Sequence, residues 1–209
     1  VVFLSLMFVF RSAVADWNDV PSGSMQPTIE IGDRILVNKM AYDVRLPFTT
    51  ISLIKRADPQ RGDIVIFASE AADNRLVKRV VGVPGDVVAM QHNVLSINGE
   101  QLAYNQLIGA VEVDSATGSD SQLLSEQLGT ITHTVKLAPF ATGRDSFAAV
   151  RVPQGHYLVL GDNRDNSADS RVIGFVPRNE IVGRASSVLF SLDYDNYYLP
   201  RSERFLAAL

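Results

Sequence analysis

The chain has 209 residues, of which 46% are hydrophobic and 20% charged, so a single compact domain or a core with a subdomain is expected and a disordered chain is excluded. The 19 Lys and Arg against 23 Asp and Glu give a formal charge of -4, and this lack of a basic excess argues against nucleic acid as a partner. The absence of cysteine excludes disulfides, thiol nucleophiles and thiolate metal sites, but it fits either a reducing or an oxidising compartment.

The first 10 residues, VVFLSLMFVF, form an uncharged apolar run. A bilayer span needs about 20 such residues, so this run is predicted to be the end of a truncated membrane anchor. The alternatives are the apolar part of a signal peptide and a buried helix. Ala13-Val14-Ala15 favours the signal peptide because it is a small-x-small cleavage pattern, whereas Arg11 interrupts the apolar run before it. We assign residues 1–15 to the C-terminal part of a transmembrane anchor and its linker.

Beyond Trp17 the chain is predicted to be mostly β. Short runs rich in Val, Ile, Leu and Tyr and bounded by Gly, Pro, Asp and Asn are typical of strands. They cover residues 35–37, 63–67, 76–81, 87–90, 94–97, 150–152 and 157–160. Pro84-Gly85-Asp86 predicts a turn, and Asn98-Gly99 predicts a type I′ hairpin that pairs 94–97 with the segment after Glu100.

Residues 112–130 are polar and poor in aromatics, which predicts an exposed excursion within a second β-rich lobe. Strand patterns resume at Val150 without a linker, so an insertion is favoured over a separate domain. The expected fold is therefore mostly β. An antiparallel core, residues 16–97 and 151–209, carries an inserted β-rich cap subdomain, residues 98–150.

Pro21 to Met25 read PSGSM, a sequence that on its own is typical of a turn. A serine nucleophile needs a proton acceptor nearby. The chain offers the histidines His92, His133 and His156, but none lies in a recognisable triad context.

Lysine is the other candidate base, and it must be unprotonated near neutral pH, which requires apolar surroundings. In the predicted strand 76–81, alternation places Lys78 between Leu76 and Val80 on one face. The alternative is that Lys78 extends to solvent while Arg79 pairs with a carboxylate.

The polar segment GDNRDNSADSR, residues 161–171, follows the apolar run 157–160. A calcium loop is one interpretation, but Asp162-x-x-Asp165 lacks the alternating oxygen ligands and terminal glutamate of an EF-hand, so we predict no metal. A hydrogen-bonding loop is favoured instead. It would aim Ser167 at a buried amine, with Asp169 and Arg171 paired to hold the loop.

Four segments together resemble the boxes of the bacterial signal peptidase I family, membrane-bound leader peptidases that use a Ser-Lys dyad. In chain order they are PSGSMQPTIEIGDRILVNK, RGDIVIF, VKRVVGVPGD and GDNRDNSADSR. The resemblance implies a mostly antiparallel β fold with an inserted cap. It also implies a monomer without cofactor or metal, placed on the bacterial cytoplasmic membrane with its catalytic core on the outer side.

The resemblance also implies a role for each matching residue. Ser24 corresponds to the nucleophile and Lys78 to the general base. Ser22, with the backbone N–H of Ser24, corresponds to the oxyanion hole, and Gly23 is expected to let the backbone turn between the two serines. The residues that would orient and support the lysine are Ser167, Asp169 and Arg171.

The family removes signal peptides from exported preproteins after a small-x-small motif. The implied walls of the small substrate pockets are Val20, Pro21, Met25, Ile29, Ile35, Leu76, Val77 and Ala168. For Ile29 and Ile35, an ordinary core position is almost as good an interpretation. The peptide is expected to bind extended, as a strand beside Lys78 and the segment before Ser24.

Membrane lipid is a further expected partner, contacted near Trp17 and Phe48. The position of Ala13-Val14-Ala15 shortly before Ser24 raises the hypothesis that the enzyme clips itself after Ala15. Two alternatives remain. A self-cleaving Ser-Lys repressor is disfavoured by the lack of a helix-turn-helix and of an Ala-Gly pair to cleave, and a membrane-tethered β module that binds a partner would leave Ser24 and Lys78 unexplained.

Overall fold

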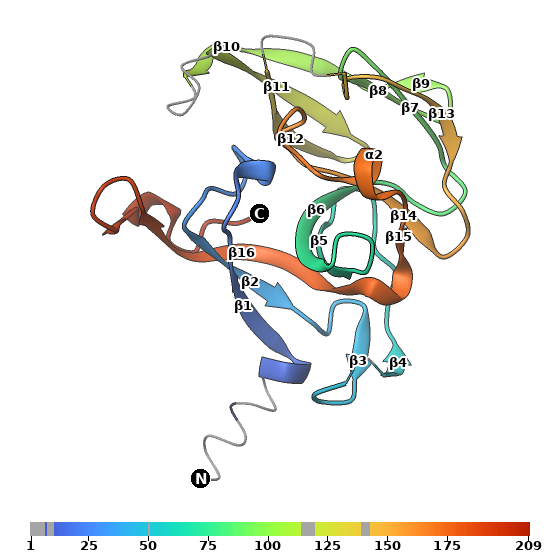
Figure 1. Ribbon diagram of the computed structural model, residues 1–209, viewed down its shortest axis with the longest axis vertical. Coiled ribbons are helices and arrows are strands. Elements are labelled where there is room, and N and C mark those ends of the chain that lie inside the picture. Colours follow the sequence, from blue (N-terminus) through green and yellow to red (C-terminus); the bar gives the residue numbers. More distant parts are fainter. Residues whose placement is uncertain (1–6, 8–10, 50, 114–119, 139–142) are drawn as a thin grey trace.

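Antiparallel strands make up most of the described chain, as the sequence predicts (Figure 1). The computed structural model describes residue 7 and residues 11–49, 51–113, 120–138 and 143–209. Within these ranges none of the helices has the length and apolar character of a bilayer span. The predicted anchor, residues 1–15, lies largely outside the described residues.

Eight strands form the central sheet, in the order β1-β2-β16-β5-β6-β14-β15 with β17 attached to β16. Their bounds are β1 Ala15–Asp19, β2 Asp33–Asn38, β5 Ile64–Ser69, β6 Asn74–Gly82, β14 His156–Leu160, β15 Val176–Pro177, β16 Ile181–Asp193 and β17 Leu199–Pro200. The strands predicted at 35–37, 63–67, 76–81 and 157–160 are confirmed as parts of β2, β5, β6 and β14.

Two smaller sheets lie together at the top of Figure 1, with the orders β13-β7-β8-β9 and β10-β11-β12. Their bounds are β7 Val87–Gln91, β8 Val94–Ile97, β9 Glu100–Gln101, β10 Tyr104–Val113, β11 Asp120–Leu128, β12 Ile131–Leu137 and β13 Phe147–Arg151. The four-stranded sheet contains residues on both sides of the predicted cap boundaries at 97/98 and 150/151, and the division into domains stays a prediction.

A two-stranded hairpin, β3 (Asp43–Arg45) and β4 (Ser52–Lys55), lies at the opposite end, near the N-terminus (Figure 1). The remaining elements are single turns of helix. They are η1 Gly23–Met25, α2 Ser170–Ile173, η2 Arg178–Glu180 and η3 Ser202–Arg204.

The predicted type I′ hairpin is confirmed. Asn98 and Gly99 have φ values of 54° and 88°, and Ile97 pairs with Glu100 across the turn. The turn predicted at Pro84-Gly85-Asp86 is also present, since the Asp86 N–H donates to the Val83 carbonyl at 3.0 Å.

The predicted exposed excursion at 112–130 is wrong for residues 120–128, which form β11 between β10 and β12. The error arises because alternate residues of a strand point to opposite faces, so a strand with many polar residues can still have one buried face. Leu128 packs in a core cluster and Glu126 is 0% exposed. Residues 114–119 of the excursion lie outside the described residues.

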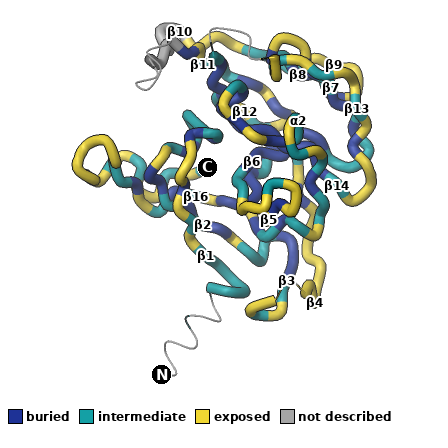
Figure 2. Tube along the Cα trace, in the orientation of Figure 1, coloured by how far each residue is buried: buried dark blue, intermediate teal, exposed yellow. Residues whose placement is uncertain are grey.

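Strand β6 contributes to three core clusters at once. Val77 packs against the first, Val81 belongs to the second and Val80 to the third. Burying such side chains contributes roughly 1.5–3 kcal/mol each. Figure 2 shows the resulting buried path along β5, β6 and β14. The strand that carries Lys78 is therefore fixed on several sides by apolar packing.

A buried ion pair joins β11 to the segment after β14. Arg164 Nη2 lies 2.7 Å from Glu126 Oε1, both side chains are almost fully buried, and the Tyr104 hydroxyl also donates to Glu126. Burial opposes ionisation of Glu126, but Arg164 and His133 hold its pKa well below the usual value. Arg164 Nε donates to the Gly161 carbonyl at 3.3 Å, so the pair supports the 161–171 loop.

We predict that Glu126→Ala lowers the free energy of unfolding by about 3–5 kcal/mol, because the Arg164 charge is left buried without its partner. Glu100→Ala is the matched control: Glu100 is exposed on β9, and its loss is expected to change stability by less than about 0.5 kcal/mol. Urea unfolding of the two variants measures both values. Equal stability of the variants would contradict the importance of the pair.

Candidate active site

Ser24 lies in the single turn η1, which buried neighbours hold in place. Met25 is 1% exposed, and both Met25 and Ile29 belong to the first core cluster. Asn163 clamps the turn from the other side: its N–H donates to the Ser24 carbonyl at 3.2 Å and its Nδ2 to the Gly23 carbonyl at 3.0 Å. The position of the Ser24 hydroxyl is thus set by core packing and by two hydrogen bonds.

The predicted backbone role of Gly23 is wrong. Gly23 is not among the glycines with positive φ, so the turn does not require a glycine conformation. A Cβ at Gly23 would lie 2.7 Å from Gln26 Oε1, but this atom is the end of a flexible side chain that can move away.

Ser22 precedes the turn in an extended conformation, with φ −133° and ψ 151°. Its hydroxyl is exposed and donates to Ser24 Oγ at 3.4 Å. The two serine hydroxyls therefore lie side by side on the same face of the turn.

Lys78 enters the site from β6 and is 2% exposed, so the alternative in which it extends to solvent is wrong. Lys78 Nζ lies 2.8 Å from Ser24 Oγ and donates to the Val77 carbonyl at 2.9 Å. Burial lowers the pKa of Lys78 to about 8, although the negative charges of Asp169 and Asp162 act in the opposite direction. A substantial neutral fraction is therefore present near neutral pH.

Asp169 and Arg171 form the predicted pair. Arg171 Nε donates to Asp169 Oδ1 at 2.8 Å and Arg171 Nη2 to Oδ2 at 2.7 Å, a two-pronged contact with a fully buried carboxylate. Burial opposes ionisation of Asp169, but Arg171 and the Gly161 N–H keep its pKa below the usual value. The pair fixes the end of the 161–171 loop beside Lys78.

Ser167 is buried in the same loop. Its hydroxyl contributes to the lowered pKa of Asp169, but among the described residues no hydrogen bond of ordinary geometry joins it to Asp169 or to Lys78. A Cβ at Gly161 would lie 2.3 Å from Ser167 Oγ, so Ser167 packs directly against that glycine. The expected contact of Ser167 with the lysine amine stays a prediction.

Arg79, the residue after Lys78, makes the carboxylate pairing that the sequence suggested. Its guanidinium contacts both oxygens of buried Asp162, at 2.9 and 2.7 Å. Thr28, four residues after Ser24, donates to Asp162 Oδ2 at 2.6 Å. Burial opposes ionisation of Asp162, but Arg79 holds its pKa below the usual value. The pair therefore ties β6 to both the serine turn and the 161–171 loop.

Sequence reasoning missed the positioning contacts of Gly161, Asp162 and Asn163. All three lie in the first positions of GDNRDNSADSR, directly after the buried strand β14. That placement was the available signal, since a polar residue at the end of a buried strand needs a partner.

A cavity of about 360 Å³ opens beside Ser24 and Lys78. Six of the predicted substrate-contacting residues line it: Val20, Pro21, Met25, Ile29, Leu76 and Val77. Ile35 does not, because it is fully buried in the first core cluster, and Ala168 is exposed outside the cavity. Their contact with substrate stays a prediction.

One edge of β6 is unpaired next to this cavity. Strand β5 pairs with β6 from Asn74 to Arg79, whereas β14 pairs on the other side only from Arg79 to Gly82. No described strand covers the second edge at residues 74–78. The site can therefore accept an extended chain by backbone hydrogen bonds.

The remaining candidates for chemistry lie elsewhere. His92 is exposed, His156 contacts the Gln154 carbonyl, and His133 is next to Glu126. In the part of the chain that is described, no group of three or more His, Asp or Glu residues is arranged to hold a metal ion.

Comparison with known proteins places these residues in a family context. The family model "Signal peptidase, peptidase S26" matches residues 1–190. Signal peptidase I from Pseudomonas fluorescens and from Pseudomonas aeruginosa are each 40% identical over 200 residues, covering 90% of this chain and 69% of each relative. Signal peptidase I from Rickettsia bellii is 36% identical, covering 91% of this chain and 70% of that protein. A solved signal peptidase I from Enterococcus faecalis is 32% identical, covers 61% of this chain and 97% of that chain, and has a TM-score of 0.39.

We predict that Gly161→Ala slows acylation of Ser24 by an activated ester about 100-fold or more. A Cβ would lie 2.4 Å from the Ser24 carbonyl oxygen and 2.3 Å from Ser167 Oγ, so the turn or the loop must shift, and a displacement of about 1 Å can cost that much in rate. Gly155→Ala is the control for backbone strain alone, because the φ of Gly155 is +71° but nothing lies within 4 Å of an added Cβ, and strand β14 separates Gly155 from Gly161. Unchanged acylation in a folded Gly161→Ala variant would contradict this positioning role.

Proposed function

Because the chain belongs to the peptidase S26 family of signal peptidases, we propose that it is a membrane-bound serine endopeptidase with a Ser24-Lys78 dyad. As a member of this family the chain is a serine peptidase that removes signal peptides. The finer proposal is that it cleaves exported preproteins after a small-x-small motif. The observation that carries the proposed dyad is the 2.8 Å separation of Lys78 Nζ and Ser24 Oγ at the wall of a cavity with both apolar and polar lining.

In the proposed mechanism the neutral Lys78 amine accepts the proton of the Ser24 hydroxyl as Ser24 Oγ attacks the scissile carbonyl carbon. The resulting ammonium then gives the proton to the leaving amine, and an acyl-enzyme remains on Ser24. Water attacks this ester with Lys78 again as the base, which releases the signal peptide and restores the serine. Burial makes this possible, because it is the cause of the lowered Lys78 pKa.

The tetrahedral oxyanion would be stabilised by the backbone N–H of Ser24 and the Ser22 hydroxyl. A donor of this kind lowers a barrier by about 3–4 kcal/mol. The Ser22 hydroxyl, now in contact with Ser24 Oγ, is on the correct face of the turn for that role.

The substrate would bind as an extended strand on the unpaired edge of β6. Backbone hydrogen bonds to residues 74–78 would supply affinity, while alternate side chains would enter the cavity lined by Val20, Met25 and Leu76. These three side chains are apolar, which favours apolar substrate side chains such as alanine.

The proposed location is the bacterial cytoplasmic membrane, with the core on its outer side and the protein a monomer. The apolar run VVFLSLMFVF, and the exposed side chains of Trp17 and Phe48, support a contact with lipid. Anchoring would confine enzyme and substrate to one surface and so raise their effective concentration. Self-cleavage after Ala15 is less favoured by the structure, because Ala15 pairs with Asn38 in the sheet and would have to detach first.

We predict that Ser24→Ala and Lys78→Met each reduce cleavage of a preprotein with an Ala-x-Ala site by on the order of 10⁴-fold or more in detergent. His156→Ala is the control, since it removes a titratable side chain far from the dyad and is expected to leave the rate unchanged. Product bands and the N-terminal sequence of the mature protein give the rate and the cleavage site. A folded Lys78→Met variant that still cleaves would reject the dyad.

We predict that kcat/KM for the same substrate rises with pH, about tenfold per unit, and levels off above about 8. The base is active only when neutral, so activity is lost as pH falls below the Lys78 pKa of about 8. Asp169→Asn removes a negative charge that raises this pKa, and its midpoint is expected at lower pH. A midpoint near the ordinary lysine value, or a shift of the variant to higher pH, would argue against Lys78 as the base.

A further inference from the structure

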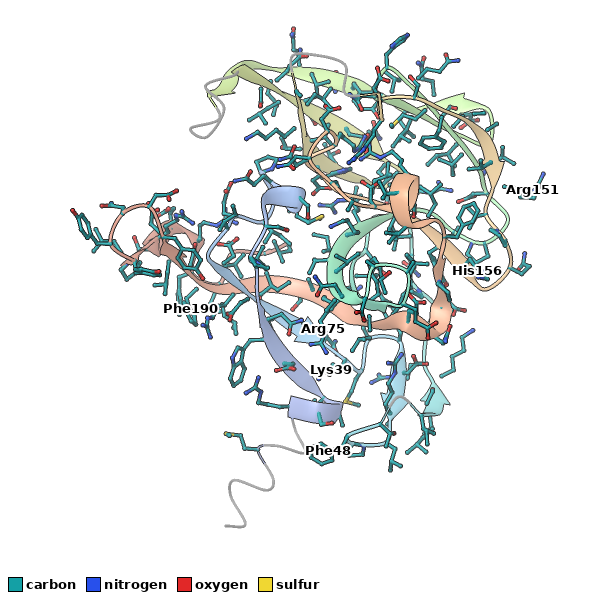
Figure 3. The ribbon with its side chains drawn as sticks, in the orientation of Figure 1. Lys39, Phe48, Arg75, Arg151, His156 and Phe190 are labelled. Carbon is teal, nitrogen blue, oxygen red and sulfur yellow. The ribbon has the colours of Figure 1, made fainter. Side chains whose placement is uncertain are left out.

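A second cavity, of about 610 Å³, lies between the β3–β4 hairpin and the residues that follow the N-terminal apolar run. Its lining includes the cations Lys39, Arg45 and Arg75, and no carboxylate. Figure 3 shows Arg75, Lys39 and Phe48 one below the other, leading from the centre of the molecule toward the N-terminal end.

The three cations are neutralised to different degrees. Lys39 Nζ is 3.1 Å from Asp16 Oδ2, and Arg45 Nη2 is 3.3 Å from Asp43 Oδ2. Arg45 Nε is buried without a hydrogen-bond partner. Arg75 is exposed and makes no ion pair within the described chain. Arg75 is therefore the cation most available to a bound anion, whereas Lys39 would share its charge between Asp16 and the anion.

The positive charge near this cavity is opposite in sign to the formal charge of the whole chain, which is -4. A generally acidic protein repels anionic ligands at long range, so attraction must come from a local group of cations. Asp16 and Asp43 lie outside the lining and pair with Lys39 and Arg45, so it is chiefly the charge of Arg75 that favours an anion in this cavity.

The β3–β4 hairpin brings exposed apolar side chains to the cavity, alongside the polar Thr49. Phe48 is 71% exposed and Ile51 57% exposed, and β4 carries the further exposed side chains of Leu53 and Ile54. A ligand that satisfies both walls is an amphiphile with an anionic head and an apolar tail. A small hydrophilic anion would leave the apolar wall in water.

The wall is also held next to the expected membrane anchor. The Phe48 N–H donates to Ser12 Oγ at 2.6 Å. In the sequence, only Arg11 separates Ser12 from the run VVFLSLMFVF. Ser12 itself lines the cavity. An anchor in the bilayer would therefore bring this cavity to the level of the lipid headgroups.

We propose that the cavity binds the phosphate of an anionic phospholipid headgroup, with Arg75 and Lys39 as its cationic contacts and the acyl chains against Phe48 and Ile51. This inference rests on the proposed membrane location. Arg75 lines the catalytic cavity as well. A lipid bound here would fix the height and tilt of the substrate groove above the bilayer.

The test is isothermal titration of the full chain, in neutral detergent, with short-chain phosphatidylglycerol, short-chain phosphatidylcholine and inorganic phosphate. The wild type is expected to bind phosphatidylglycerol most tightly. Lys39→Gln and Arg75→Gln should each weaken that binding about fivefold, the factor for one cation at a lipid headgroup. Arg151→Gln is the matched control, because it removes one exposed cation far from the cavity (Figure 3).

Equal binding of the two lipids, or equal weakening by Arg151→Gln, would overturn the proposal, since either shows no contribution from this cavity. Binding of inorganic phosphate as tight as that of phosphatidylglycerol would overturn the lipid assignment in favour of a free anion. Cleavage of an Ala-x-Ala peptide by the same samples separates the two proposals. If the wild type does not cleave the peptide while the differences in lipid binding are observed, the lipid site is supported and the Ser24-Lys78 dyad is rejected.

Discussion

The contact between Lys78 and Ser24 is the constraint on which the rest of the structure depends. A lysine amine can act as a base near neutral pH only where burial disfavours its charged form, and that burial costs stability. Here packing against three core clusters fixes β6 and so holds Lys78 in the buried position. The apolar packing of Met25 and Val77, next to Ser24 and Lys78, therefore sets the environment of the amine.

The pKa of Lys78 also depends on the negative charges near it, because they act against the effect of burial. Asp169 and Asp162 both favour the charged form of Lys78, and each is matched by its own arginine, Arg171 and Arg79. Each arginine lowers the pKa of its carboxylate and partly compensates the negative charge that Lys78 experiences. They also connect the 161–171 loop to β6, so the groups that set the lysine's protonation are the ones that set its position.

The sequence was a good guide to the strands and to the burial of Lys78, and a poor guide to contacts between distant segments. Alternation in 76–81 predicted a strand with Lys78 on one face, and Asn98-Gly99 predicted the hairpin between β8 and β9. Both predictions succeeded because their signals are local in the sequence. No local sequence signal indicates that Glu126 pairs with Arg164, 38 residues later. The polar residues around Glu126 were therefore predicted to be exposed. Gly23 shows a smaller failure: a glycine backbone conformation was expected between the two serines, but the φ of Gly23 is not positive.

The position of Arg75 suggests how substrate and membrane are brought into register. Its side chain lies between two cavities, one beside the dyad and one beside the β3–β4 hairpin. The unpaired edge of β6 begins at Asn74, next to Arg75, and ends at Lys78. A strand rises about 3.3 Å per residue, so the dyad is about 10 Å along the strand from Arg75. If the headgroup fixes Arg75, the same rigid strand fixes the distance from the bilayer at which a peptide bond can be cleaved.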